Sequence, residues 1–176
     1  MLIQSSKQRG VTLIELMIGV AITAILLAVG LPGFKVWVQN TQIRTATESM
    51  QNGLQLARAE AVRRNERVRF VLGNGTSWTV STDAGTQIQS RPSSDGSSNV
   101  TITVTPVGAT TATFNALGRI VANANATSSL TQIDLDVPTS LISASQSRDL
   151  RIYITSGGQI RSCDPSITAT GDPRKC

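Results

Sequence analysis

The chain has 176 residues, which suits one globular domain with appendages, and its formal net charge is +5 at pH 7. It contains no histidine, which excludes histidine-based acid–base catalysis, histidine metal sites and the usual Ser-His or Cys-His activation of a nucleophile. Aromatic residues make up only 3%, so a base-stacking surface is not expected. No residue pattern is typical of an enzyme, and we expect neither catalytic residues, nor a metal, nor a cofactor.

The N-terminus begins with a short basic leader, residues 1–10, which carries Lys7 and Arg9 and ends at Gly10. Residues 16–34 then contain no charge, and a run of this length is about enough to cross a bilayer core of ~30 Å as a helix. In a secretory signal the cleavage site follows the apolar run, whereas here the small residue that suits cleavage precedes it. Cleavage after Gly10 would leave the apolar helix as the new N-terminus. The leader's cations keep it on the cytoplasmic side by the positive-inside rule.

Glu15 is a carboxylate near the start of this apolar stretch, and the residues leave two interpretations open. Thr12 and Glu15 have the T-x-x-E spacing of a capping box, in which each side chain satisfies a backbone N–H of the first helical turn. Alternatively, the carboxylate pairs with a cation in or near the membrane. A new amino terminus at Val11 of a neighbouring subunit would supply that cation.

The stretch "RGVTLIELMIGVAITAILLAVGLPGF" resembles the N-terminus of type IV pilins. The resemblance implies that a prepilin peptidase cuts between Gly10 and Val11 and methylates the Val11 amine, although valine stands where the family usually has phenylalanine. It also implies that Glu15 guides subunits into a helical filament by pairing with a neighbour's N-terminus. Pro32, which lacks a backbone N–H, is expected to kink or loosen the helix.

Helical periodicity continues beyond the apolar run, so we predict one helix over residues 11–65 whose part from about 11 to 34 spans the membrane. A buried stripe is predicted from residues that recur at three- and four-residue steps: Ile43, Ala46, Met50, Leu54 (or Gly53), Ala57 and Ala61. The arginines near the end of the helix are interpreted as a solvated face: Arg58, Arg63, Arg64, Arg67 and Arg69.

Beyond residue 66 the hydrophobic period changes to two, which predicts half-buried antiparallel strands. Strands are expected around residues 68–72, 100–104, 133–137 and 150–154, with shorter ones at 77–81, 112–114, 119–121 and 159–163. Loops are expected at 73–75, 84–99, 123–129 and 140–147. Asp134 and Asp136 occupy outward strand positions and are interpreted as solvated. The predicted fold class is α+β: a long N-terminal helix, transmembrane in its first half, packed on a small antiparallel β domain of residues 66–176.

The C-terminal tail contains the chain's two cysteines, Cys163 and Cys176, which in an extracytoplasmic protein indicate one disulfide. Such a bond would present Arg161, Arg174 and Lys175 on a constrained loop. The alternative is a stapled C-terminus whose charges are incidental.

The segments "LARAEAVRRN", "FNALGRI", "GGQIRSCDP" and "GDPRKC" resemble the GspH/FimT family of minor pilins and pseudopilins. The family implies an initiating or tip-proximal subunit. Some FimT-type members bind DNA through a G-R-x-R motif near the C-terminus. At the matching residues 158–161, Gln159 replaces the first arginine and only Arg161 carries over. Contacts with DNA phosphates need positive charge rather than one exact motif, so four further residues are candidates for binding DNA: Arg148, Arg151, Arg174 and Lys175.

These resemblances imply a minor pilin of a type IV pilus, a structural or priming subunit near the filament tip. The alternatives are a pseudopilin H of the type II secretion system, a FimT-like DNA-binding minor pilin for DNA uptake, and a membrane-anchored domain with no filament role. The expected partners are other minor pilins or pseudopilins, the major pilin, the prepilin peptidase, the inner membrane and, in the third case, DNA. The expected location is the inner membrane, with a single pass and the C-terminal domain in the periplasm.

Overall fold

The computed structural model describes residues 10–176; the predicted leader cations Lys7 and Arg9 lie outside the described residues. The described chain forms one helix and nine strands, and it divides into two compact units that meet between Lys35 and Val36. The helix α1 (Leu13–Arg64) contributes to both units, and its bounds agree with the predicted helix. Each unit is described in turn.

The first unit consists, in its described part, of the beginning of α1. Every side chain from Gly10 to Lys35 is exposed, including the apolar ones. α1 is long and apolar enough to cross a membrane, with a mean hydropathy of 2.4 in its most apolar window. The helix does not end at Pro32 but continues through it, so the kink expected there stays a prediction.

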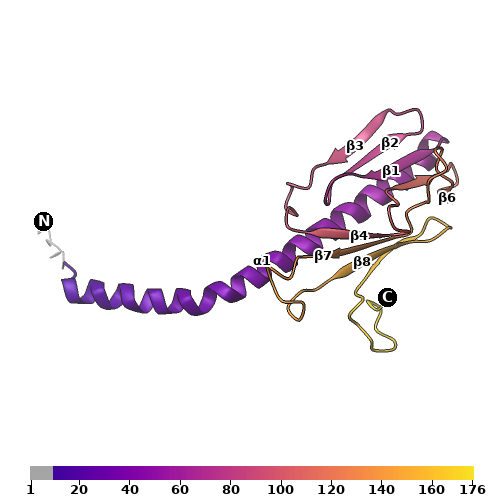
Figure 1. Ribbon diagram of the computed structural model, residues 1–176. Coiled ribbons are helices and arrows are strands. Elements are labelled where there is room, and N and C mark those ends of the chain that lie inside the picture. The colour runs from indigo at the N-terminus through magenta and orange to yellow at the C-terminus, as the bar shows by residue number, and fades with distance from the viewer. Residues whose placement is uncertain (1–9) are drawn as a thin grey trace, which may run out of the picture. The chain divides into compact units, whose positions relative to one another are not determined.

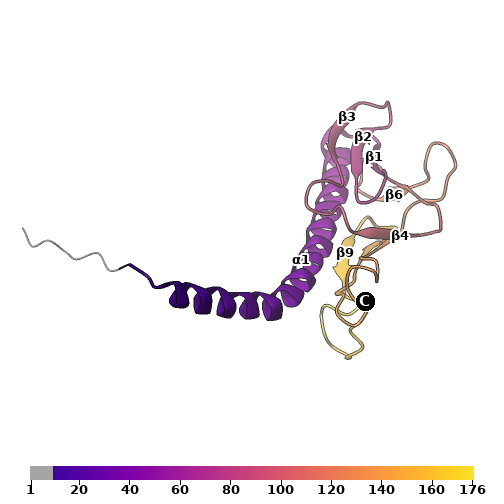
Figure 2. The same cartoon turned by 60° about the vertical axis from the view of Figure 1, so that its left-hand side comes forward.

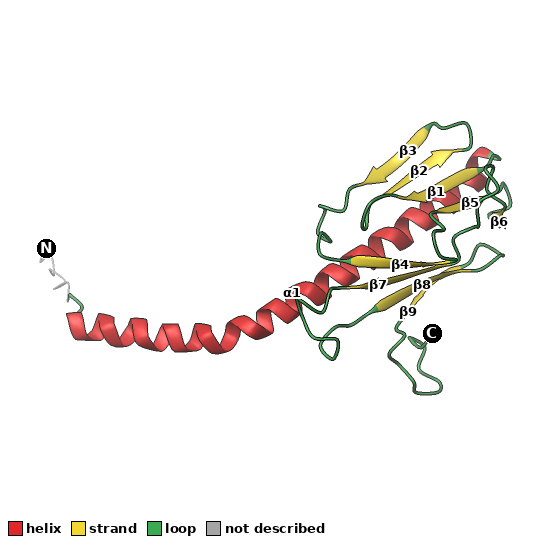
Figure 3. Cartoon of the chain, viewed as in Figure 1, coloured by secondary structure: helices red, strands yellow, loops and turns green. Residues whose placement is uncertain are grey.

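The second unit contains two antiparallel sheets (Figures 1 and 3). The five-stranded sheet has the order β3-β2-β1-β5-β6, made of β1 (Val68–Leu72), β2 (Trp78–Thr82), β3 (Gln87–Arg91), β5 (Thr111–Phe114) and β6 (Ile120–Val121). The four-stranded sheet has the order β4-β7-β8-β9, made of β4 (Thr101–Thr105), β7 (Gln132–Asp136), β8 (Leu150–Ile154) and β9 (Ile160–Cys163). All neighbouring strands pair antiparallel, as the alternating pattern predicted.

The second part of α1 packs on both sheets through the predicted stripe, and the strands lie along one side of it (Figure 2). Its buried residues include all of those predicted and the small polar residues beside them: Ile43, Ala46, Thr47, Ser49, Met50, Gly53, Leu54, Ala57 and Ala61. The apolar ones, from Ile43 to Ala61, join one hydrophobic core with residues of both sheets, such as Phe70 and Ile152. The α+β architecture of a long helix on a small antiparallel domain is thereby confirmed.

An aromatic pair fills the core between α1 and the five-stranded sheet. The rings of Phe70 and Trp78 lie with centroids 5.8 Å apart. The indole Nε1–H of Trp78 donates a hydrogen bond of 2.9 Å to the Ser49 hydroxyl on α1. A Cβ atom placed on Gly53, one turn further along, would lie 2.9 Å from the Phe70 ring and 3.0 Å from the Trp78 ring. A glycine at this position therefore lets both rings reach the helix backbone.

One predicted loop, residues 84–99, is wrong in its middle, because it contains strand β3. The segment has a single aliphatic residue, Ile88, which gives no alternating pattern to detect. β3 is an edge strand, held through backbone pairing with β2 on one side only, with Trp78 opposite Arg91. Pairing of this kind does not require the strand to bury a face.

In the arginine face that was predicted to be solvated, Arg63 and Arg64 are exposed as predicted, Arg67 and Arg69 are half-buried, and all four side chains meet carboxylates. Glu60 accepts hydrogen bonds from Arg63 (2.6 Å) and Arg64 (2.7 Å). The hydrogen bonds from Arg63 and Arg64 lower the pKa of Glu60 to about 2. Asp83 lies 3.7 Å from the Arg67 guanidinium and 3.6 Å from the Arg69 guanidinium, pairs that form only once β1 and β2 are adjacent. The fifth, Arg58, is exposed as predicted.

Candidate functional site

The predicted processing site is accessible and precedes the helix. Gly10 and Val11 are both exposed, and α1 begins at Leu13. Thr12 occupies the N-cap position, where its hydroxyl accepts a hydrogen bond of 3.3 Å from the Glu15 N–H. This contact is the Thr12 half of the predicted capping box. Cleavage after Gly10 stays a prediction that this geometry permits.

The Glu15 side chain is exposed on the first turn of α1. Within residues 10–176, its carboxylate has neither a hydrogen bond nor an ion pair, so the Glu15 half of the capping box is not formed. A carboxylate without an internal partner is available to a cation from another molecule. The predicted pairing with a neighbour's amino terminus remains untested, as does any contribution of Glu15 to assembly.

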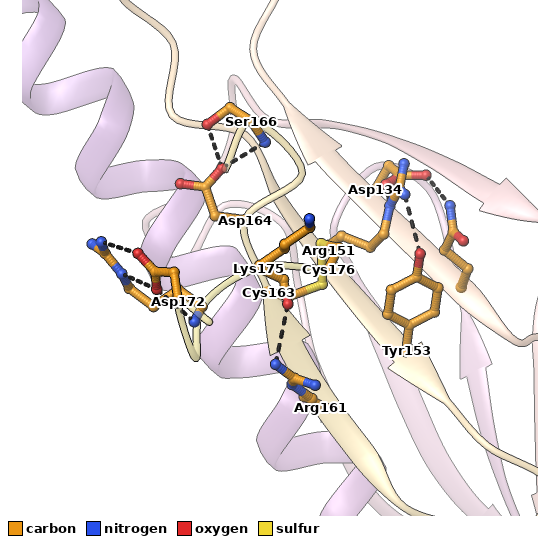
Figure 4. The surroundings of a disulfide bond; sticks show 12 residues. Asp134, Arg151, Tyr153, Arg161, Cys163, Asp164, Ser166, Asp172, Lys175 and Cys176 are labelled. Carbon is orange, nitrogen blue, oxygen red and sulfur yellow. Dashed lines mark hydrogen bonds and ion pairs between the residues drawn. A yellow bond between two sulfur atoms is a disulfide. The ribbon is translucent and has the colours of Figure 1, made fainter. Parts of the chain in front are cut away.

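The C-terminal tail is closed by the predicted disulfide between Cys163 and Cys176, whose Cα atoms are 5.1 Å apart (Figure 4). Backbone and side-chain hydrogen bonds fold the tail back on β9. The Asp164 N–H donates to the Arg174 carbonyl at 2.7 Å, and the Arg161 guanidinium donates to the carbonyls of Pro173 (2.7 Å) and Lys175 (3.1 Å). The Arg161 side chain therefore stabilises the folded tail.

Two other candidate DNA-binding cations of the tail also have internal partners. The Arg174 guanidinium forms an ion pair of 2.9 Å with Asp172, and hydrogen bonds from Arg174 lower the pKa of that carboxyl. The Lys175 ammonium donates to the Thr168 carbonyl at 3.1 Å. Both side chains remain exposed, but each is already engaged within the tail.

Arg151 is paired inside the four-stranded sheet, and this corrects the interpretation of Asp134 as a solvated residue. The register of β7 and β8 places Asp134 directly opposite Arg151, and the two side chains form a hydrogen-bonded ion pair (Figure 4). Arg151 also donates to the Tyr153 hydroxyl at 3.1 Å, and Gln132 donates to Asp134 at 2.6 Å. The bond to Asp134 raises the pKa of Arg151. Asp136 is exposed as predicted.

Arg148, the fifth candidate, differs from the other four, because its guanidinium has no hydrogen-bond or ion-pair partner within residues 10–176. Its backbone, in contrast, is fixed to α1. The Arg148 N–H donates to the Asn40 side-chain oxygen at 2.9 Å, and the Asn40 amide donates to the Gln146 carbonyl at 2.9 Å. The loop before β8 is thus clamped on the helix by one asparagine.

A cleft of about 440 Å³ lies beside this clamp, within the second unit. We name it the α1–tail cleft; it is lined by Trp37, Asn40, Thr41 and Arg44 of α1, by Arg148 and Leu150, and by Ser162, Cys163, Asp164, Pro173 and Arg174 of β9 and the tail. Sequence reasoning did not find it, because its three arginines come from three distant segments. Only the predicted disulfide indicated that the tail would be held in one place.

Two family models match the chain. The model described as Type II transport protein GspH matches residues 46–158, and the prokaryotic N-terminal methylation motif matches residues 5–31. Among solved structures, the chain resembles the type IV minor pilin FimU of Pseudomonas aeruginosa (strain PAO1) in two crystal forms. The first has a TM-score of 0.48 and 18% identity, covering 71% of this chain and 90% of that one. The second has a TM-score of 0.47 and 17% identity, covering 72% and 97%.

A search of curated proteins gives no match. The GspH model spans more than half of the chain, and the methylation motif covers the segment that resembles a pilin N-terminus. The chain belongs to the GspH family, and it is a member of the type IV minor pilins and pseudopilins.

Proposed function

We propose that the chain is a minor pilin of a type IV pilus, a structural and priming subunit near the filament tip. The observation that carries this proposal is the exposed apolar helix of the first unit with one carboxylate, Glu15, on its first turn. The prepilin peptidase would remove residues 1–10. Before assembly the subunit would be anchored in the inner membrane, with the second unit in the periplasm.

The apolar side chains of residues 11–34 need a non-aqueous environment, because exposing so many of them to water is unfavourable. A bilayer provides one such environment before assembly, and packing against the equivalent helices of other subunits provides the second. In the bilayer, Glu15 would lie near the start of the apolar run, close to the membrane surface, where a charge costs less than at the centre. In a filament, the amino terminus of a neighbouring Val11 would give that carboxylate a partner.

The disulfide-closed tail favours a pilus over a secretion system. It contains two of the four segments that resemble the GspH/FimT family, including the stretch that matches the FimT-type G-R-x-R motif at Arg161, and most of it lies beyond residues 46–158, where the GspH model matches. The tail's internal bonding gives it one defined surface, which suits contacts with a few particular subunits. We infer a structural role for the whole chain, in keeping with its family.

DNA uptake is not part of the proposal. Four of its five candidate cations, Arg151, Arg161, Arg174 and Lys175, have partners inside the domain. Among these five candidates, and within residues 10–176, only the Arg148 guanidinium has no partner, and one such cation is not an argument for a DNA-binding surface, since affinity for DNA rises with the number of phosphates neutralised. DNA binding therefore stays a prediction.

The test is deletion of the gene in its own host, followed by complementation with the wild-type chain, with Glu15→Ala and with Glu48→Ala. Glu48 is an exposed carboxylate on the same helix in the second unit, so its variant controls for loss of one negative charge. We expect deletion to abolish surface pili while type II secretion continues, and only Glu15→Ala to fail in complementation.

A secretion defect with normal pili would assign the chain to the secretion system instead. Normal pili together with normal secretion in the deletion strain would contradict a filament role of either kind.

A further inference from the structure

Two of the three arginines that line the α1–tail cleft have no acidic partner within residues 10–176. Arg44, Arg148 and Arg174 line it, and Asp164 is the one acidic residue among its lining residues. Arg174 is held by Asp172, but within residues 10–176 neither Arg44 nor Arg148 has an acidic group within 4 Å. Two guanidinium groups from different segments thus border one concave site, an arrangement that suits an anion with several oxygens, such as a phosphate.

The backbone around the cleft is fixed although its arginine side chains are exposed. Asn40 clamps the Arg148 N–H to α1, and the disulfide at Cys163 fixes the tail that forms the opposite wall. The backbone of the residues that line the cleft therefore need not rearrange when an anion binds, which lowers the entropic cost of binding.

The cleft also has apolar walls, formed by Trp37, Leu150 and Pro173. The Trp37 side chain is 62% exposed, which is unusual for a large aromatic residue in the second unit, where Trp78 is only 3% exposed. Tryptophan is enriched at membrane–water interfaces, where its apolar ring and polar N–H meet different surroundings. A ligand that carries both an anion and apolar groups matches such a lining better than a free anion does.

The position of the cleft residues along α1 indicates which ligand of this kind is available. In the sequence, Trp37 comes three residues and Arg44 ten residues after Phe34, the last residue of the uncharged run. Cations next to a membrane-spanning helix attract anionic headgroups.

We propose that the α1–tail cleft binds the headgroup phosphate of an anionic phospholipid, with Arg44 and Arg148 as its cationic contacts and Trp37 against its apolar part. The inference needs the membrane anchor common to pilins and pseudopilins, but it does not depend on the choice between a pilus and a secretion system.

The experiment uses the full chain in a neutral detergent, titrated separately with phosphatidylglycerol, phosphatidylcholine, inorganic phosphate and a short DNA duplex, with bound species counted by native mass spectrometry. The cleft variant is Arg44→Gln/Arg148→Gln. The matched control is Arg58→Gln/Arg119→Gln, which removes the same charge from two exposed arginines outside the cleft. Arg44→Lys/Arg148→Lys retains the charge.

We expect phosphatidylglycerol to bind the wild type and the control alike, and to bind the cleft variant about 25-fold more weakly, from about fivefold for each arginine. The lysine variant should retain most of the affinity. Weak binding of phosphatidylcholine and inorganic phosphate would support an anionic lipid as the ligand.

Equal losses in the cleft and control variants would overturn the proposal, because they would show attraction to net charge alone. Inorganic phosphate binding as tightly as phosphatidylglycerol would overturn the lipid as the ligand, as would phosphatidylcholine binding as tightly. DNA binding that is lost in the cleft variant, with lipid binding unaffected, would identify a nucleic-acid site instead.

Discussion

Gly53 is the place on α1 where the aromatic rings of the core come closest to the helix backbone, and Gly53→Ala tests how tightly that contact is packed. In an exposed helical site this substitution stabilises a protein, because alanine has the higher helix propensity by about 1 kcal/mol. At Gly53 the added methyl would lie 2.9 Å from a Phe70 ring carbon and 3.0 Å from two ring carbons of Trp78. Carbon atoms in favourable contact are about 3.5–4.0 Å apart, so the rings would have to move by roughly 0.5–1 Å.

Neither ring is free to move by that amount. Phe70 and Trp78 are 0% and 3% exposed and contact each other, and the indole is further held by Ser49. Overpacking of a core costs about 1–3 kcal/mol, from which the propensity gain of about 1 kcal/mol is subtracted. We therefore expect Gly53→Ala to lower the free energy of unfolding by up to about 2 kcal/mol and the Tm by up to roughly 6 °C, and not to raise them as in an exposed helical site.

The assay is urea denaturation of the full chain in detergent, followed by the near-ultraviolet circular dichroism of the aromatic residues. Ala59→Gly, at an exposed position of the same helix, measures the propensity contribution alone, and we expect it to lose about 1 kcal/mol. Ser49→Ala leaves the buried Trp78 N–H without its hydrogen-bond acceptor and should lower the free energy of unfolding by about 1–3 kcal/mol. If Gly53→Ala proved more stable than the wild type, the packing argument would be refuted.

Three further predictions concern the tail, the end of the helix and processing. Replacing Cys163 and Cys176 by serine should lower the free energy of unfolding by about 3 kcal/mol, because the disulfide closes a loop with a sequence separation of 13 and so restricts the unfolded chain. Urea denaturation measures this loss, and an unchanged midpoint would contradict the prediction. Glu60, whose folded pKa of about 2 lies below its ordinary 4.5, adds stability that is complete above pH 4.5 and is lost as the pH falls through about 2. Glu60→Gln should therefore lower the free energy of unfolding by up to about 1 kcal/mol at pH 7. The difference in denaturation midpoint between this variant and the wild type should be smaller at pH 2 than at pH 7, and a difference that does not change with pH would be inconsistent with this pKa. Gly10→Leu should leave the uncut precursor in membranes, which intact-mass analysis detects, and normal cleavage there would disprove the proposed processing site.

The helix and most of the strands were predictable because their residues repeat at regular intervals. Ile43, Met50 and Leu54 fall on one face of a helix of 3.6 residues per turn, and each is fully buried on the sheets. Ile133 and Leu135 alternate with aspartates in the same way along β7. The disulfide was predictable for a different reason, because the sequence has only two cysteines and the expected location outside the cytoplasm favours their pairing.

Features that depend on register or on distant segments were not predictable. Asp134 and Arg151 form an ion pair because β7 and β8 align them opposite each other, and nothing local to either residue shows that alignment. Strand β3 lacks an apolar alternation, and its partner β2 determines its conformation through the backbone. The α1–tail cleft likewise requires Arg44 and Arg148 to meet across the fold.

We propose that the chain enters a filament through its apolar helix, with Glu15 pairing with a neighbouring subunit. The most direct measurement is quantitative mass spectrometry of the sheared filament fraction and of the inner membrane, from a strain complemented with either the wild-type chain or Glu15→Ala. We predict that the wild type is present in filaments at a small fraction of the major pilin, and that Glu15→Ala reaches normal levels in the membrane but is missing from filaments. A wild-type chain that never appears in the filament fraction, or a Glu15→Ala chain that is incorporated normally, would contradict the claim.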